Sequence, residues 1–136
     1  MLNRLIVTAL SALALAGCRG DKLPPPVAIF PEDVCSNCKM ALSQSRFASE
    51  FITAAGDVRK FDDLRCLSEY RREMKPSDEI LVTYLRDYDA DRWHPADSCV
   101  VVRTGIATPM GSGLVAVADS ARARDLLAQH PPAAAP

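Results

Sequence analysis

The sequence predicts an α+β fold of two small, related units, each built as strand, strand and helix, with a further strand after the first helix. An N-terminal tether with a lipid anchor precedes them. Three observations support this prediction: short β-branched and aromatic runs lie between turn residues, two apolar segments recur at helical spacing, and the strand–strand–helix order occurs twice, about 50 to 57 residues apart. The 136 residues suffice for one compact domain or two very small units that share a core.

Residues 1–17 have the layout of a secretory signal peptide. Arg4 precedes an apolar run that is too short to remain as a membrane-spanning helix. Leu15-Ala16-Gly17-Cys18 resembles the lipobox of bacterial lipoproteins, in which the cysteine sulfur receives a diacylglyceryl group before cleavage. We therefore expect Cys18 to carry acyl chains, each of which contributes about 0.8 kcal/mol per buried methylene to membrane binding. The alternative is a chance cysteine after an ordinary cleavage site.

The mature chain is expected to contain three regions. Residues 18–31 combine the lipidated cysteine with a proline-rich segment, which predicts an extended tether. The folded domain is expected at 32–130, with one unit at about 32–86 and the second at about 87–130. The Pro/Ala tail at 131–136 is expected to be disordered.

Three strands are predicted in the first unit. Residues 49–53 and 58–61 predict a pair, because strand-forming residues lie on both sides of the Gly56-Asp57 turn. Residues 79–85 form a short run of β-branched and aromatic residues and predict a third strand.

A helix is predicted between the second and third of these strands. Asp62 or Asp63 is expected to cap its beginning, and Pro76 marks its end. The apolar positions near helical spacing are Leu64, Leu67, Tyr70 and Met74.

The second unit repeats this order. Residues 99–103 and 113–118 predict two strands, and Asp119 is expected to cap a helix that ends before Pro131. The apolar positions of this helix are Ala123, Leu126 and Leu127.

Composition and motifs exclude several classes of function. The formal net charge of −1 provides no basic surface for nucleic acid. No glycine-rich phosphate loop, catalytic triad or dinucleotide fingerprint occurs, so the sequence does not predict an enzyme of those classes. Asp62 and Asp63 are a carboxylate pair, but helix capping accounts for them and no histidine or nucleophile nearby suggests acid–base catalysis.

The segment Cys35-Ser36-Asn37-Cys38-Lys39-Met40 places three sulfur atoms within six residues. Thiolates and thioethers are soft donors, which favour Cu(I) over cations that prefer oxygen. A Cys-x-Met pair also suits reversible carriage, because the thioether binds copper without deprotonation while the thiolate supplies charge. Cys38 and Met40 are therefore the first candidate ligands, with Cys35 beside them.

Other interpretations of these sulfurs remain open at the level of sequence. Cys35 and Cys38 form a Cys-x-x-Cys pair that could serve a membrane-anchored thiol–disulfide oxidoreductase, although no strand is predicted before it. A plain Cys35–Cys38 disulfide is a further alternative, as is a passive lipoprotein whose sulfurs are structural. A structural zinc site would need a second ligand pair. The remaining cysteines and histidines of the domain stand singly, at Cys66, His94, Cys99 and His130.

Three segments resemble the NosL family, whose members are copper chaperones for nitrous oxide reductase. Residues 32–40 are similar to a segment of that family in which acidic residues precede a Cys-x-x-Cys-Gly-Met motif. Residues 61–67 are similar to its Phe-Asp-Asp segment, and residues 108–113 to the beginning of its second half. The lipobox agrees, since members of the family are typically lipoproteins.

The resemblance implies a fold of two related α+β units and a function in copper delivery. It implies that Cys38 and Met40 bind Cu(I) for the copper centres of apo-nitrous oxide reductase, in cooperation with a copper-maturation transporter. It also implies a periplasm-facing lipoprotein of the cell envelope, held on the inner or outer membrane. Lys39 departs from the family, which commonly has glycine at this position; its positive charge should favour an ionised Cys38.

Three further residues are candidate copper ligands. Met110 lies in a flexible turn, although packing in the core explains it equally well. His94 is expected on a connecting loop, where a histidine can reach a metal. Cys66 is expected near a helix N-terminus, where a lowered pKa would suit metal binding; an inert buried thiol or a disulfide with Cys99 is the alternative.

Overall fold

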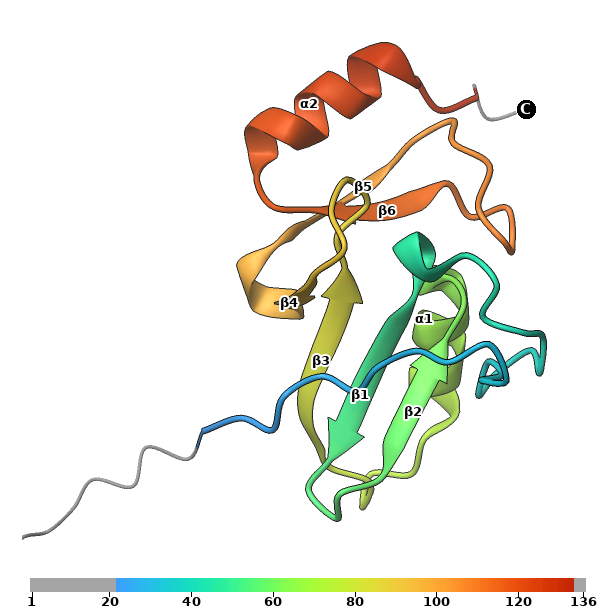
Figure 1. The fold of residues 1–136 in the computed structure, drawn as a ribbon, viewed down its shortest axis with the longest axis vertical. Helices are drawn as coiled ribbons and strands as arrows, with labels where there is room; N and C mark the ends of the chain where they lie inside the picture. The colour runs from blue at the N-terminus through green and yellow to red at the C-terminus, as the bar shows by residue number, and fades with distance from the viewer. Residues whose placement is uncertain (1–21, 134–136) are drawn as a thin grey trace, which may run out of the picture.

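The computed structural model describes residues 22–133 of the chain (Figure 1). The predicted signal peptide at 1–17, the predicted lipidation site Cys18 and the end of the predicted tail at 134–136 lie outside this part. The elements confirm the α+β prediction. The strands are β1 (Ser49–Thr53), β2 (Val58–Phe61), β3 (Ile80–Arg86), β4 (Trp93–Pro95), β5 (Val100–Arg103) and β6 (Leu114–Val117). The helices are α1 (Leu64–Glu73) and α2 (Ser120–Gln129), with short 3-10 helices η1 (Ser45–Phe47) and η2 (Ala96–Ser98).

The first sheet is antiparallel and has the order β2-β1-β3-β4. Its central strand β1 is buried along its whole length, because both faces of the sheet are covered. On one face, Phe51 packs against Phe61 of β2 and Tyr70 of α1, with ring centroids 5.6 and 5.9 Å away. This aromatic group anchors α1 to the sheet and begins the core beneath the predicted sulfur-rich loop.

The other face of this sheet is crossed by the N-terminal segment, on the side opposite α1 (Figure 1). Tyr84 donates a 2.7 Å hydrogen bond to the carbonyl of Pro24, and the amide of Val27 donates one of 2.7 Å to Glu50. The segment is extended, as the proline-rich composition predicts. It nevertheless packs on the domain, so the packed region begins near Pro24, ahead of the predicted boundary at residue 32. The sequence did not indicate this because the backbone of the segment makes these contacts.

Strand β4 was not predicted, and its presence corrects the placement of His94. Trp93, His94 and Pro95 pair with β3 instead of forming a connecting loop, and His94 faces Leu85. Three residues that end in proline are too short to show the alternation by which strands are recognised. A part of the predicted second unit therefore belongs to the first sheet.

The second sheet consists of the antiparallel pair β5 and β6, which α2 covers. Val115, Val117, Ala123 and Leu126 form its buried core, and Phe47 of η1 joins them. Because Phe47 precedes β1 in the chain, the core of the second unit includes a residue of the first. The backbone amide of Tyr88 also donates to the carbonyl of Ala116 at 2.9 Å, which ties the end of the first sheet to β6. The two predicted units thus share their packing.

Both helices begin at an aspartate, as predicted. Asp63 is the N-cap of α1 and accepts a 2.8 Å hydrogen bond from the amide of Arg65. Asp119 is the N-cap of α2 and accepts one of 2.9 Å from the amide of Arg122. The cap of α1 is thus Asp63 and not Asp62, which leaves the carboxylate of Asp62 available for other contacts.

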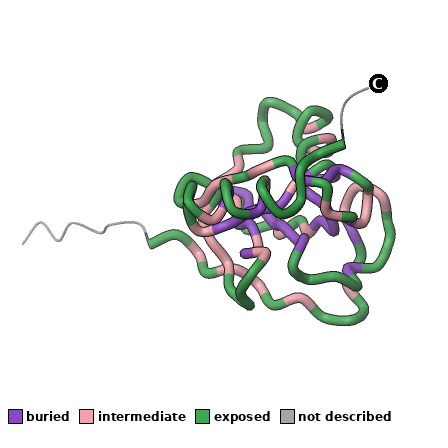
Figure 2. Tube along the Cα trace, turned by 90° about the horizontal axis from the view of Figure 1, so that it is seen from above, coloured by how far each residue is buried: buried purple, intermediate pink, exposed green. Residues whose placement is uncertain are grey.

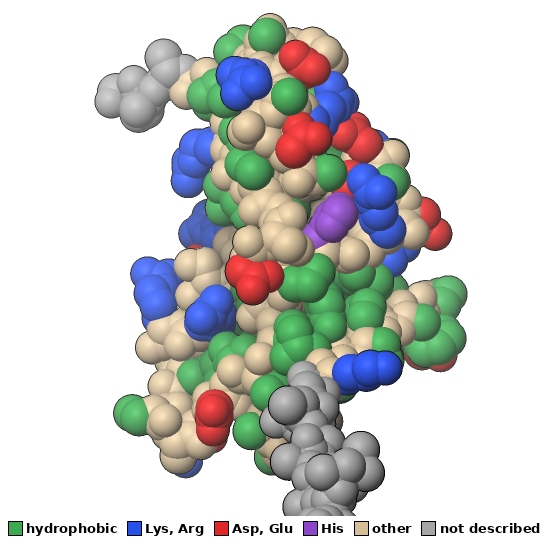
Figure 3. All heavy atoms as spheres, turned by 90° about the vertical axis from the view of Figure 1, so that its left-hand side faces the viewer, with side chains coloured by type: hydrophobic (Ala, Val, Ile, Leu, Met, Phe, Trp, Pro, Cys, Tyr) green, Lys and Arg blue, Asp and Glu red, His purple; other side chains and the backbone are tan. Residues whose placement is uncertain are grey.

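The buried residues lie in the interior of the fold, with exposed residues around them (Figure 2). Hydrophobic side chains also gather on the surface near the point where the N-terminal segment meets the domain (Figure 3). Leu23 and Leu81 line a shallow pocket there, and each is about half exposed. Among residues 22–133, none of the helices has the length and apolar character needed to cross a membrane.

Candidate metal site

The sulfur-rich segment forms a tight loop between Val34 and Ala41, which pair as an isolated antiparallel bridge. Inside the bridge, the amide of Cys35 donates to the carbonyl of Met40 at 2.7 Å, and the amide of Lys39 donates to the carbonyl of Cys35 at 3.0 Å. These short-range bonds turn the chain sharply, so that the residues between Cys35 and Met40 are held by the backbone. The loop is therefore preformed around its cysteines.

Lys39 adopts a left-handed backbone conformation with φ of 64°. It is the only non-glycine residue with positive φ in the described part of the chain. A side chain in this region is strained by about 1 to 2 kcal/mol, whereas glycine adopts it freely. The loop therefore requires the conformation that the glycine of the similar family motif would provide. The ammonium group of Lys39 donates to the carbonyl of Ser36 at 2.6 Å.

The loop is attached to β2 beside the beginning of α1. The amide of Ser36 donates to the carbonyl of Lys60 at 2.7 Å, and the amide group of Asn37 donates to Glu69 of α1 at 3.0 Å. Asp62 follows the end of β2, and Cys66 lies in the first turn of α1. The strand-to-helix junction thus presents both side chains to the loop.

Four side chains converge at this junction into what we call the thiol cluster: Cys35, Cys38, Asp62 and Cys66. Their sulfur and carboxylate oxygen atoms all lie within 4.8 Å of one another. The thiol of Cys38 is 3.5 Å from each carboxylate oxygen of Asp62. Ligand atoms around a metal with bonds of about 2.3 Å are separated by roughly 3.8 Å, so this arrangement is compatible with metal binding after small movements.

The thiol cluster is buried on one side and open on the other. Cys35 and Cys66 are inaccessible to solvent, and Asp62 is 3% exposed. Cys38 is half-buried and provides the open side. Burial raises the pKa of Cys35, although backbone N–H groups of Asp62, Cys38 and Asn37 act in the opposite direction. Without a cation, a thiol in this environment favours its neutral form.

Burial also raises the pKa of Cys66, because it outweighs the favourable effect of the Asn37 side chain. The expected lowering of the Cys66 pKa near the helix N-terminus is therefore wrong. Proximity to Asp62 and Cys35 adds to the rise, since negative neighbours disfavour a second thiolate. A bound cation would supply the positive charge that stabilises deprotonated sulfur ligands.

The second unit reaches this junction through the buried carboxylate of Asp63. Thr108 donates to Asp63 at 2.7 Å, Ser112 at 2.6 Å and the amide of Met110 at 2.9 Å. Burial by itself raises the pKa of Asp63, but the hydrogen bonds of Ser112, Thr108, Arg65 and Met110 outweigh it and hold the pKa below its usual value. The carboxylate is therefore kept ionised, and it fixes the 108–112 loop against the beginning of α1.

The structure brings together three of the predicted sulfur ligands. Cys35, Cys38 and Cys66 meet in the thiol cluster, so Cys66 does not stand singly. The four cysteines within residues 22–133 are free, and neither a Cys35–Cys38 nor a Cys66–Cys99 disulfide is present in this part. Met40 follows Cys38 on the loop and is 54% exposed, so its thioether is accessible.

Two other predicted ligands lie in different surroundings. Met110 is half-buried and packs against the same core cluster as Cys35 and Cys66. His94 is not part of the thiol cluster; its Nε2 atom is 2.7 Å from the carboxylate of Asp87. The pair places His94 at the end of the first sheet, where a structural role explains it.

Sequence reasoning missed Asp62 as a member of the cluster, because capping seemed to account for both adjacent aspartates. Only one of two neighbouring residues can be the N-cap of a helix. Once Asp63 takes that role, Asp62 needs another partner, and this was the signal available in the sequence. A cysteine four residues later, Cys66, projects from the first turn of the same helix.

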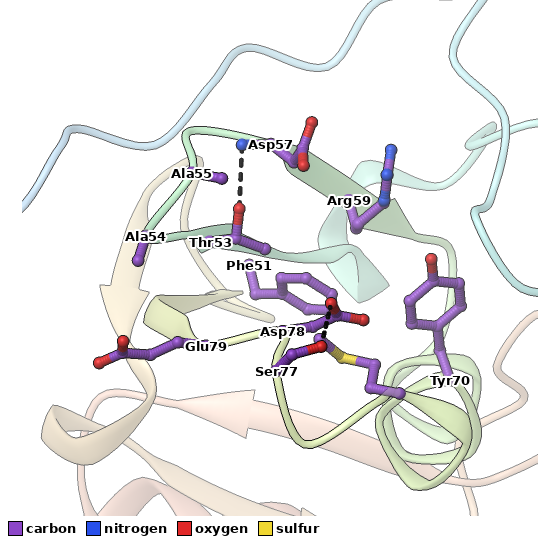
Figure 4. Close-up of a pocket in the computed structure, with 11 residues that line it drawn as sticks. Phe51, Thr53, Ala54, Ala55, Asp57, Arg59, Tyr70, Ser77, Asp78 and Glu79 are labelled. Atoms are coloured by element: carbon purple, nitrogen blue, oxygen red, sulfur yellow. Dashed lines mark hydrogen bonds between the residues drawn. The ribbon is translucent and has the colours of Figure 1, made fainter.

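A separate cavity of about 340 Å³ is lined by the β1–β2 turn, by α1 and by the segment between α1 and β3 (Figure 4). Its lining includes Phe51 and Tyr70 and contains none of the cysteines. The polar contacts within it stabilise local turns: the amide of Asp57 donates to Thr53 at 3.1 Å, and Ser77 donates to Asp78 at 3.4 Å. The cavity therefore carries no comparable set of ligands.

Two similarities to known proteins extend over most of the chain. The sequence profile of the NosL family matches residues 26–132. The crystal structure of the copper chaperone NosL from Shewanella denitrificans shares the fold, with a TM-score of 0.67 and 20% sequence identity over 79% of this chain and 90% of that chain. Curated protein sequences gave no match. Because the family profile spans nearly all the described residues, including the thiol cluster, the chain belongs to the NosL family.

Proposed function

We propose that this protein is a copper chaperone without enzymatic activity, which binds Cu(I) and delivers it to nitrous oxide reductase. The observation that carries the proposal is the convergence of three cysteine sulfurs in the thiol cluster. The exposed Met40 follows Cys38 by two residues on the same loop. Soft sulfur donors select Cu(I) over oxygen-loving cations. Membership of the NosL family and the shared fold with a copper chaperone support the same function.

Cys38 and Met40 are the ligands from which copper leaves in this proposal. Cys38 is the half-buried thiol of the cluster, and Met40 lies two residues further along the same loop, where it is 54% exposed. A thiolate and a thioether leave coordination positions open on Cu(I). Donors of a recipient protein can then enter and displace the two ligands in turn.

The recipient is the apo form of nitrous oxide reductase, during maturation of its copper centres, with components of a copper-maturation transporter as further partners. The resemblance of residues 32–40 and 61–67 to the NosL family supports this assignment. The lipobox at 15–18 supports a periplasm-facing lipoprotein of the cell envelope. Cys18→Ser is expected to move the protein from the membrane fraction to the soluble fraction and to abolish lipid labelling, whereas Cys99→Ser leaves both unchanged. Retention of Cys18→Ser on membranes would contradict the anchor.

Copper binding is tested with the full-length chain, purified in detergent and kept anaerobic and reduced. Competition with a chromophoric Cu(I) chelator measures the affinity. Cys38→Ser is expected to weaken binding at least about tenfold, and Met40→Leu by a smaller factor. Cys99→Ser is the matched control, because Cys99 is not part of the thiol cluster. Failure of the wild-type protein to retain Cu(I), or unchanged affinity in both ligand variants, would contradict the proposal.

Delivery is tested separately by adding the copper-loaded chain to apo-nitrous oxide reductase and following the absorbance of its copper centres. Transfer is expected to be faster than from an equal concentration of the copper–chelator complex, since ligand exchange at an exposed site needs no release of free metal. A rate equal to that of the chelator complex would count against this recipient.

The alternative of a thiol–disulfide oxidoreductase finds less support. Reactive cysteines are partly exposed and have a lowered pKa, often at the first turn of a helix. Cys35 is inaccessible to solvent, its pKa is raised by burial, and Cys35 and Cys38 lie in a loop. Turnover of a disulfide substrate by the wild-type protein, with Met40 dispensable, would favour the alternative.

A further inference from the structure

Two thiols of the cluster have no role in the Cys38–Met40 pair. Cys35 and Cys66 are both inaccessible to solvent and belong to the hydrophobic core cluster, with the buried carboxylate of Asp62 beside them. They come from different parts of the chain, one from the loop and one from α1. Inert buried cysteines have no need to converge on a common point, so their arrangement calls for a ligand.

We propose that Cys35, Cys38 and Cys66 form an inner Cu(I) site of three thiolates, and that Cys38 is shared between this site and the exposed pair with Met40. The inference rests on the proposed function. It adds a buried site that holds copper and a direction in which copper leaves that site. The ligand class is a soft monovalent cation, because all three donors are sulfur.

The geometry of the cluster fits such a site. Three sulfurs around one metal at about 2.3 Å would lie roughly 4 Å apart, and the atoms of the cluster are all within 4.8 Å of one another. Small side-chain rotations are therefore enough to close the site. Asp62 lies beside the same sulfurs, but a carboxylate oxygen is a hard donor that Cu(I) does not favour. Its two 3.5 Å contacts orient the Cys38 thiol.

Burial and the carboxylate of Asp62 disfavour ionisation of the two buried sulfurs, so a bound cation would have to supply the balancing positive charge. Two features of the surroundings act in the same direction as the cation. Cys66 occupies the first turn of the ten-residue helix α1, where the helix dipole stabilises an anion. The backbone N–H groups of Asn37, Cys38 and Asp62 act against the rise in pKa that burial gives Cys35, and the side chain of Asn37 does the same for Cys66. Positive partial charges thus approach both sulfurs from the loop and from the helix.

Release proceeds by ligand exchange, with copper as Cu(I) throughout and no electron transferred. On binding, each cysteine that becomes a ligand gives up one thiol proton to solvent. On release, the copper bonds to Cys35 and Cys66 break, a bond to the Met40 thioether forms, and the bond to Cys38 is kept. The two freed thiolates then take up one proton each. Copper is thereby protected by the core until it moves to the surface pair.

The test uses the full-length chain in detergent, loaded anaerobically with one equivalent of Cu(I). X-ray absorption at the copper edge counts sulfur neighbours, and chelator competition gives affinity. The wild type is expected to show three sulfurs. Cys35→Ser and Cys66→Ser are expected to lose one sulfur and at least about tenfold in affinity, more than Met40→Leu loses, while Cys99→Ser matches the wild type.

Met40→Leu keeps the test decisive if either buried variant fails to fold, because Met40 is exposed and its replacement leaves the core intact. This variant is expected to keep three sulfurs and to transfer copper to a chelator more slowly. A two-sulfur shell in the wild type, a loss of one sulfur in Met40→Leu, or wild-type affinity in Cys35→Ser and Cys66→Ser would overturn the inner site. Copper chaperone function would survive those results, whereas a wild type that retains no Cu(I) would overturn both.

Discussion

The hydroxyl of Ser112 donates a 2.6 Å hydrogen bond to the carboxylate of Asp63, across 49 residues of sequence. Thr108 and the backbone of Met110 bind the other oxygen of the same carboxylate. Since Asp63 is also the N-cap of α1, a loop of the second unit determines where this helix begins. Cys66 lies in its first turn and Asp62 directly before the cap, so the same contact positions half of the thiol cluster.

Replacing Asp63 is expected to destabilise the protein strongly. Asp63→Ala removes a helix cap and leaves the buried hydroxyls of Thr108 and Ser112 without their acceptor. We expect the free energy of unfolding to fall by about 3 kcal/mol, measured by urea denaturation. Asp119→Ala removes the cap of α2 and is the matched control, expected to cost about 1 kcal/mol. Equal losses in the two variants would show that the contacts with the second unit add nothing.

The lowered pKa of Asp63 predicts a loss of stability in acid. The folded state holds this carboxylate ionised, whereas the unfolded chain protonates near the ordinary value of 3.8. As pH falls below that value, the unfolded state takes up the proton first and unfolding becomes more favourable. Urea denaturation at several pH values should show this contribution fully present above about pH 4 to 5 and lost as pH falls through the folded-state pKa. Asp63→Asn should remove it; an unchanged pH dependence would contradict the prediction.

Glu50 is expected to affect the pH dependence of stability in the opposite direction from Asp63. It is inaccessible to solvent, one carboxylate oxygen accepts from Val27, and the other has no hydrogen-bond partner. Burial raises its pKa, so the folded state resists ionisation and this group opposes folding at neutral pH. Glu50→Gln should therefore raise the free energy of unfolding at pH 7 by about 1 kcal/mol, with less gain in acid. Glu79→Gln, an exposed control, should change little; destabilisation by Glu50→Gln would contradict the argument.

Lys39→Gly is expected to stabilise the metal-binding loop. The residue has positive φ, a conformation that strains a lysine and suits a glycine. We expect thermal or urea unfolding to show a gain of about 1 kcal/mol, because relief of strain exceeds the added freedom of the unfolded chain. Lys75→Gly is the control: Lys75 is exposed and has no positive φ, so this change should be neutral or destabilising. A loss of stability in Lys39→Gly would contradict the role of the conformation.

The sequence by itself determined most of the secondary structure and indicated the kind of chemistry. Strands β1, β2, β3, β5 and β6 and both helices follow from patterns that extend over a few residues, because side-chain periodicity and caps act locally. The same holds for the sulfur-rich loop, whose spacing and resemblance to a family motif indicated copper.

Only the tertiary structure decided which side chains share a site. The contact of Cys38 with Asp62 spans 24 residues, and that of Tyr84 with Pro24 spans 60. No local pattern specifies such pairs, since they depend on how the sheet, α1 and the N-terminal segment pack together. For this reason Cys66 could be named as a ligand candidate from the sequence, while its meeting with Cys35, and the choice of Asp63 as the cap, required the folded chain.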